Sequence, residues 1–161
     1  MFKKALFTGM VLGMTTIASV AMAAVSSTEA FDIAKAETSP TAAVFGYEEK
    51  FHKYEIKLQD RESMTRYEVD VDKSTGRILE LDIKTAGNPV SRNVVKSVED
   101  IRAIVLAEYP DAKNINIKLD REDYGHKYEV KFQTAKFRLA EMDINPETGA
   151  IVERDLKYNI F

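Results

Sequence analysis

The amino-acid sequence predicts an α+β protein made of two tandem units, each with one helix packed on a four-stranded antiparallel sheet. An eight-residue phrase occurs twice, as HKYEIKLQ at residues 52–59 and HKYEVKFQ at residues 126–133, with only apolar residues exchanged. Helical spacing precedes each copy, and segments with alternating polar and apolar residues follow it. A phrase that is kept twice in this order indicates a repeated folding unit and not an active site.

Residues 1–23 have the pattern of a secretory signal peptide. A pair of lysines precedes an uncharged apolar run, and Ala21, Met22 and Ala23 supply the small residues of a cleavage site. We expect cleavage between Ala23 and Ala24, and therefore export to the bacterial periplasm or the medium. A retained membrane anchor is the alternative, but the run is short for a span and no basic cluster follows it.

The first unit is expected at residues 24–84. Ser26 and Glu29 have the spacing of a capping box, and the helix that follows should end before Pro40. Alternation of apolar and polar residues then predicts half-buried antiparallel strands. The glycine that ends the motif DKSTG (72–76) suits the left-handed position of a hairpin loop. Strands are expected at 43–47, 54–59, 67–71 and 79–83.

A short linker, residues 85–95, contains glycine, asparagine and proline and precedes a second unit at residues 96–161. Ser97 and Asp100 repeat the capping box, and Pro110 repeats the helix stop. The motif NPETG repeats the turn. Strands are expected at 115–119, 128–133, 140–144 and 152–156, and each unit should have its own small core, centred on Ile56, Val69 and Leu81 or on Ile101, Val130 and Met142.

The two copies differ locally in two places. Arg154 occupies the position that Leu81 occupies in the first copy, and the second copy lacks one residue in its middle hairpin. A charged side chain on an otherwise apolar face predicts that the packing differs there.

The composition is that of a globular protein with no cysteine, 30% charged residues and a net charge of -3. The absence of cysteine excludes disulfide frameworks, thiolate zinc sites and cysteine nucleophiles. The slightly negative charge argues against nucleic acid and anionic membranes as partners, because both require concentrated positive charge.

Short motifs recur in the same order in the two copies. They are Tyr54-Glu55-Ile56, Tyr67-Glu68-Val69-Asp70, Asp72 and Thr75-Gly76-Arg77-Ile78 in the first, and Tyr128-Glu129-Val130, Met142-Asp143-Ile144-Asn145 and Thr148-Gly149-Ala150-Ile151 in the second. This order of helix, strands and turn resembles the PepSY domain, and the resemblance covers nearly all of the expected mature chain. It implies a domain without catalytic residues that restrains peptidases or binds partners in the cell envelope, as in the propeptides of thermolysin-like metallopeptidases. The paired helix-and-sheet units are also similar in architecture to secreted β-lactamase-inhibitor proteins, which have cysteines.

Two sets of residues could bind a metal ion. His52 and His126 hold equivalent places, but each is alone in its repeat, so we expect both to open a strand at the surface. Carboxylates on the outer sheet face could hold Ca²⁺ or act as acid and base, but no calcium loop is present and basic residues balance them. We expect a solvated face there. These carboxylates are Glu68, Asp70, Asp72, Glu80 and Asp82, and their counterparts in the second copy are Asp143, Asn145, Glu153 and Asp155.

We therefore predict an exported, non-enzymatic binding module whose partner is an envelope protein, with a peptidase as the first choice. The alternative is a periplasmic binder of metal ions or small ligands that uses the carboxylate face. No catalytic residue, cofactor site or metal ligand is assigned, and no nucleic-acid partner or stable membrane insertion is expected after cleavage. Aromatic residues at interfaces carry much binding energy, and the candidates are Phe45, Tyr47, Phe51, Tyr109 and Tyr124.

Overall fold

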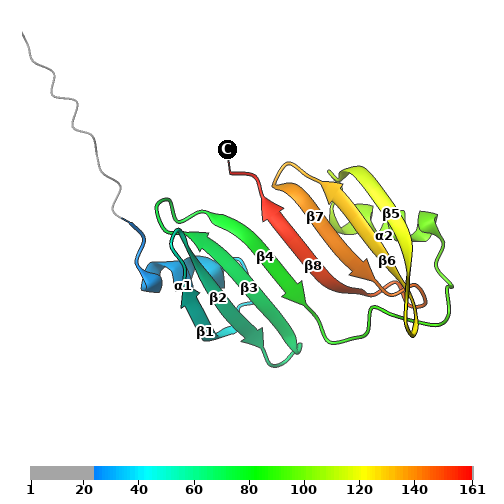
Figure 1. Ribbon diagram of the computed structural model, residues 1–161, viewed down its shortest axis with the longest axis horizontal. Coiled ribbons are helices and arrows are strands. Elements are labelled where there is room, and N and C mark those ends of the chain that lie inside the picture. The colour runs from blue at the N-terminus through cyan, green and yellow to red at the C-terminus, as the bar shows by residue number, and fades with distance from the viewer. Residues whose placement is uncertain (1–23, 161) are drawn as a thin grey trace, which may run out of the picture.

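Residues 24–160 are described by the computed structural model, and within them the chain forms one eight-stranded antiparallel sheet and two helices (Figure 1). The expected signal peptide, with Ala23, lies outside these residues. The strand order is β1-β2-β3-β4-β8-β7-β6-β5. The elements are α1 (Ser27–Ala36), β1 (Ala43–Glu49), β2 (Lys53–Asp60), β3 (Thr65–Asp72), β4 (Ile78–Lys84), α2 (Val98–Glu108), β5 (Lys113–Glu122), β6 (Gly125–Gln133), β7 (Phe137–Ile144) and β8 (Ile151–Tyr158).

The expectation of two separate four-stranded sheets is wrong. The order of helix and four strands does repeat along the chain, but β4 pairs with β8, from Glu80 opposite Lys157 to Lys84 opposite Glu153. Two separate sheets would have four edges with unpaired backbone N–H and C=O groups. The pairing of β4 with β8 satisfies two of these edges and leaves only β1 and β5 at the borders.

Both helices cover the same face of the sheet, and the opposite face is bare (Figure 1). Helix α1 packs on β2 and β3, and α2 packs on β5. The buried apolar side chains form one connected core, so the expectation of two separate cores is also wrong. The residues expected at the core centres are nevertheless all buried: Ile56, Val69, Leu81, Ile101, Val130 and Met142.

The helix caps form as the sequence predicts. The Ser26 N–H donates to Glu29 Oε2 at 2.8 Å, and the Ser97 N–H donates to Asp100 Oδ2 at 2.8 Å. In both boxes the serine hydroxyl accepts a hydrogen bond from the third helical N–H in return. Both helices end before the predicted proline stops. No helix within residues 24–160 is long and apolar enough to cross a membrane.

The two hairpin turns hold their glycines in the left-handed region, as predicted. Gly76 has φ +69° and Gly149 has φ +78°. The residue that opens each turn accepts hydrogen bonds from it: Ser74 N–H donates to Asp72 Oδ1 at 3.0 Å, and Glu147 N–H donates to Asn145 Oδ1 at 2.9 Å. An amide oxygen does this as well as a carboxylate, which explains why Asn145 can replace the aspartate of the first turn.

Residues 85–95 run along the second half of the chain and are tied to it. Ser91 and His126 exchange backbone hydrogen bonds of 2.9 and 2.8 Å, and the Val95 N–H donates to the Pro146 carbonyl at 3.0 Å. These bonds give the polar backbone of an irregular segment its partners.

Arg154 lies on the helix-covered side of the sheet, where the sequence predicts a local change of packing. Its Nη2 is 2.9 Å from Glu108 Oε1 at the end of α2. This ion pair, which joins β8 to α2, accounts for a charged residue at the position of Leu81.

Candidate functional site

The bare face of the sheet carries a line of six charged side chains that crosses six strands. Residues directly opposite each other on neighbouring strands point to the same face, so the pairing registers fix this line. Neighbouring strands lie about 4.8 Å apart, which gives the line a length of about 24 Å. We call it the central row; from β2 to β6 it consists of Lys57, Glu68, Asp82, Asp155, Glu141 and Lys131.

Like charges meet at the middle of the central row. Asp82 stands directly opposite Asp155 at the junction of β4 and β8, and the carboxylate oxygens of these two residues and of Glu80 lie within 4.8 Å of one another. Lys157 contacts this group, with Nζ 3.2 Å from Asp155 Oδ2 and 3.6 Å from Glu80 Oε1. Asp82 makes no ion pair or side-chain hydrogen bond with any residue of 24–160.

The electrostatics follow from this crowding. Burial, together with the charges of Asp155 and Glu80, raises the pKa of Asp82 to about 6. Burial and the neighbouring Asp155 raise the pKa of Glu80, and burial and Glu55 raise the pKa of Glu68. The centre of the face therefore holds more negative charge than its own lysines neutralise.

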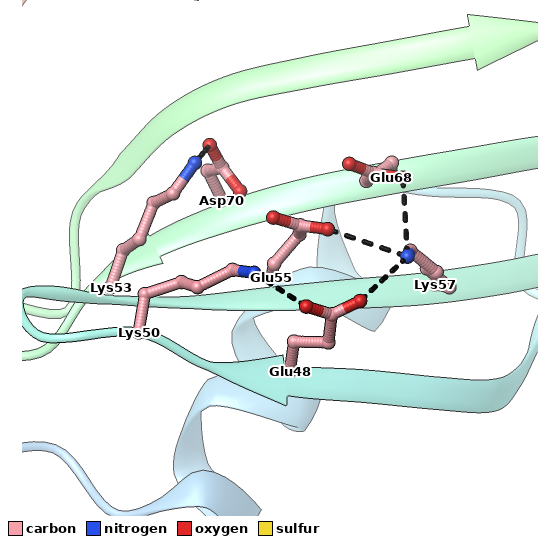
Figure 2. Close-up of polar contacts among 7 residues, drawn as sticks. All are labelled: Glu48, Lys50, Lys53, Glu55, Lys57, Glu68 and Asp70. Carbon is pink, nitrogen blue, oxygen red and sulfur yellow. Dashed lines mark hydrogen bonds and ion pairs between the residues drawn. The ribbon is translucent and has the colours of Figure 1, made fainter.

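The lysines at the two ends of the row also form ion pairs with carboxylates outside the row. Figure 2 shows Lys57 Nζ between three of them, 3.3 Å from Glu48, 3.4 Å from Glu55 and 4.0 Å from Glu68. At the other end, Lys131 Nζ is 2.9 Å from Glu141 of the row and 3.0 Å from Glu129 outside it. Their positive charge is thus shared with acids outside the row and does not compensate Asp82.

Two buried carboxylate oxygens near the centre have no hydrogen-bond donor. They are Asp70 Oδ1 and Asp155 Oδ1. The Asp70 side chain is only 10% exposed and faces Glu80 on the next strand. Its Oδ2 pairs with Lys53, as Figure 2 shows, while Oδ1 has no partner. A buried acceptor without a donor is costly, so both atoms favour a ligand that brings N–H groups.

Two hollows lie on this face and meet at Asp82. One, of about 360 Å³, is lined in part by Asp82, Glu141 and Asp155. The other, of about 240 Å³, is lined in part by Phe45, Glu68 and Asp82. Both are shallow and open, so they can receive side chains of a partner but do not enclose a small molecule.

The structure brings together most of the carboxylates that the sequence singles out. Glu68, Asp70, Glu80 and Asp82 share the bare face, and Asp143, Glu153 and Asp155 join them from the other half. Asp72 and Asn145 do not join this group as the sequence suggested, because the side chain of each accepts a hydrogen bond within its own turn. Glu141 was missed, although its place in the repeat is equivalent to that of Glu68, and this equivalence was the signal that could have found it.

The two histidines do not meet. His52 is exposed in the turn before β2, and His126 lies near the start of β6. Four strands, β3, β4, β8 and β7, separate β2 from β6 in the sheet. A site that needs both imidazoles is therefore excluded.

The second half of the chain matches a known protein family. Residues 95–155 match the family model described as peptidase propeptide and YPEB domain, PepSY. This segment is therefore similar to PepSY domains. It contains α2, β5, β6 and β7 and most of β8. The match does not extend to residues 24–84, so a second PepSY copy there stays a prediction.

The solved structures that are similar to this chain have low sequence identity to it. The C-terminal domain of YpeB from Bacillus megaterium is 14% identical, with a TM-score of 0.45, and the alignment covers 81% of this chain and 62% of that one. This chain thus spans less than two thirds of that structure. A BLIP-like protein from Bacteroides fragilis is 14% identical, with a TM-score of 0.36 and coverages of 84% and 89%. A search of curated proteins gave no match.

The aromatic residues suggested as interface anchors are spread over the molecule. Tyr109 and Tyr124 lie in the segment that matches the PepSY model; Tyr109 packs partly buried on the core, while Tyr124 is 80% exposed at the turn between β5 and β6. Phe51 is 98% exposed beside β1. Tyr47 packs edge to face against Phe31 of α1, on the covered side. Phe45 alone lines a hollow of the bare face.

Proposed function

We propose that this protein is an exported, non-catalytic binding module that binds and modulates a peptidase or another protein of the cell envelope. The observation that carries the proposal is the bare face of the eight-stranded sheet, with the four acids of its central row, in which Asp82 faces Asp155 and has no ion pair within residues 24–160. The match of residues 95–155 to the PepSY model supports it, because the family's description includes the propeptides of peptidases. No catalytic role is proposed for the carboxylates, since the hollows beside them are too open to exclude water.

The bare face is a better docking surface than the two sheet edges. Strand addition at β1 or β5 is the alternative way to bind a protein segment. Each edge strand has a register shift, between Val44 and Gly46 in β1 and between Lys113 and Asn116 in β5. Bulges and edge lysines discourage the addition of another strand. The face, in contrast, presents about 24 Å of ordered charge.

Site-specific photo-crosslinking tests the proposal. A photoreactive residue replaces Lys84, whose side chain is 63% exposed on the bare face, or Arg102, which is exposed on α2 as a matched control. The protein is incubated with envelope extract, and the crosslinked products are identified by mass spectrometry. We expect one defined protein to crosslink at Lys84 and not at Arg102. Equal labelling at both positions, or none at Lys84, would contradict docking on this face.

Export is part of the proposal. The apolar run and the small residues before Ala24 predict that the mature chain begins at this residue. Intact-mass measurement of the exported protein should give the mass of residues 24–161. Recovery of the full-length precursor from the inner membrane would contradict this part of the proposal.

Cation binding is the second candidate function, and one observation favours it. Glu80, Asp82 and Asp155 bring carboxylate oxygens within 4.8 Å of one another, as a hard cation requires. Lys157 already contacts two of the three, however, and supplies part of the positive charge that an ion would bring. We therefore expect calorimetric titration with Ca²⁺ or Zn²⁺ to show weak binding. A stoichiometric site of micromolar affinity would make this candidate the first.

A further inference from the structure

We infer that the partner places an arginine-bearing segment across the central row, so that its guanidinium groups lie against Glu68, Asp82, Asp155 and Glu141. The inference rests on the proposed function and names the chemistry of the partner. It is carried by four observations on the bare face: its charge, its unpaired acceptors, its spacing and the exposed ring of Phe45.

The charge distribution calls for cations at the centre. Four consecutive members of the row are acids. The two lysines of the row lie at its ends, where Lys57 also forms ion pairs with Glu48 and Glu55. Asp82 has no ion pair within the described residues, and its burial and the acids around it disfavour its ionised form. Cationic side chains set on these four residues would convert a repulsive arrangement into an attractive one.

The unpaired acceptors favour arginine over lysine. Asp70 Oδ1 and Asp155 Oδ1 are buried and have no donor, although Asp70 already pairs with a lysine through its other oxygen. A guanidinium group has five N–H donors in a planar fork and can bond two acceptors at once, whereas an ammonium group is a compact point charge. One arginine can therefore bond carboxylate oxygens of two neighbouring acids of the row at once, which one ammonium group does less well.

The spacing and the aromatic ring fit an extended segment. The four acids span about 14 Å across neighbouring strands, which a partner of about five extended residues can follow. Phe45 is 61% exposed and lines the same hollow as Glu68 and Asp82. A guanidinium plane that stacks on an aromatic ring while it pairs with a carboxylate is a common arrangement.

A second copy of this chain fits the face less well. Two such faces brought together would set one acidic centre against the other, and like charges at an interface are costly. The two helices cannot cover the row either, because both pack on the opposite face of the sheet (Figure 1).

The test uses a synthetic peptide of about seven residues that alternates arginine and serine, and a glutamate–serine peptide as control. Binding is followed by amide chemical shifts of the mature protein at low and high salt. Two double variants have equal net charge. Asp82→Asn with Asp155→Asn alters the row, and Glu62→Gln with Asp123→Asn alters exposed acids in two turns elsewhere. Denaturant melts check that both variants fold.

We expect the arginine peptide to shift amides of β3, β4, β7 and β8, with binding that weakens as salt screens the charges. The Asp82 and Asp155 variant should bind about tenfold more weakly, and the control variant should match the wild type. Equal weakening in both variants would overturn the inference, because net charge alone would then suffice. Binding of the glutamate peptide, or displacement of the arginine peptide by micromolar Ca²⁺, would also overturn it.

Failure here can be told apart from failure of the proposed function. A protein that crosslinks at Lys84 but binds its partner equally well with and without the Asp82 and Asp155 charges would keep the binding module and refute the arginine contact. If no partner crosslinks at position 84 in the protein that keeps Asp82 and Asp155, both the proposed function and the arginine contact are refuted.

Discussion

Single residues decide whether the centre of the bare face is stable or strained. Asp82 and Asp155 stand opposite each other on paired strands, and like charges in this position destabilise a sheet. Natural proteins keep such local conflicts mainly where a function needs them. The energetic consequence of this pair can be measured without knowledge of the partner.

Asp82→Asn should stabilise the protein at neutral pH and not in acid. The pKa of Asp82 is raised from 3.8 to about 6, so the folded state holds its proton more tightly than the unfolded state. The aspartate therefore costs no stability below about pH 4, and the cost grows until the pH passes about 6. After allowance for solvent screening, we expect a gain of about 1 kcal/mol near pH 7.5 and about none near pH 4.

Urea melts at the two pH values measure this gain. Glu62→Gln serves as the control, since that side chain is exposed and should give the same small change at both pH values. A gain that is independent of pH, or a loss at neutral pH, would show that the charge of Asp82 is compensated in the free protein.

The two faces of a strand should differ sharply in their tolerance of alanine. Ile56 and Val130 are fully buried, and truncation of either should cost about 2–4 kcal/mol in unfolding free energy. Glu55 and Lys131 lie on the bare face and form ion pairs there, so truncation should cost less than about 0.5 kcal/mol. Denaturant melts of the four variants compare the faces. Similar losses for both pairs would mean that the strand register is wrong.

At the level of elements, the two hairpin turns depend on glycine for their shape. Gly76 and Gly149 have positive φ, and a Cβ on Gly149 would lie 2.8 Å from Ile104 Cδ1. Valine at either position should cost about 2 kcal/mol or more, because β-branched residues are strained in this region. Gly46→Ala is the matched control, since no atom lies within 4 Å of its added Cβ. Melting of the three variants should leave only the control near wild type.

The elements themselves could be predicted from the sequence, because each is fixed by local pattern. The capping boxes at Ser26 and Ser97 locate the helices, and period-two alternation locates the strands and their buried faces. The strand that extends over Lys113–Glu122 was predicted only at 115–119, since exposed edge residues blur the alternation at its ends.

The sequence does not predict which strands are neighbours in the sheet. Alternation tells which side chains point inward but not which strand lies alongside, so the pairing of β4 with β8 could not be predicted from it. The opposition of Asp82 and Asp155, and with it the centre of the candidate site, depends wholly on this pairing. Arg154 marked the right region, because a charge at the position of Leu81 indicated an irregular environment, but it did not indicate a partner strand.

At the level of the whole molecule, one sheet and one core predict one cooperative unit. The buried side chains of both halves belong to a single cluster, and β4 and β8 are paired along their lengths. Unfolding should therefore be a single transition, with coincident curves for far-ultraviolet circular dichroism and tyrosine fluorescence. Ile56→Ala and Val130→Ala, one in each half, should each move the whole curve. Two separate transitions, with only one moved by each variant, would restore the picture of independent units.

The central row also reads as a palindrome. From either border of the sheet the order is lysine, glutamate, aspartate, aspartate, glutamate, lysine, because β4 and β8 run antiparallel and meet at the same residue of each half. A cationic chain laid across it would find the same charges whether it ran in one direction or the reverse. Charge can thus select the partner without fixing its polarity. That choice falls to whatever breaks the symmetry beyond the lysines, with the exposed ring of Phe45 near one end and Asn116 near the other.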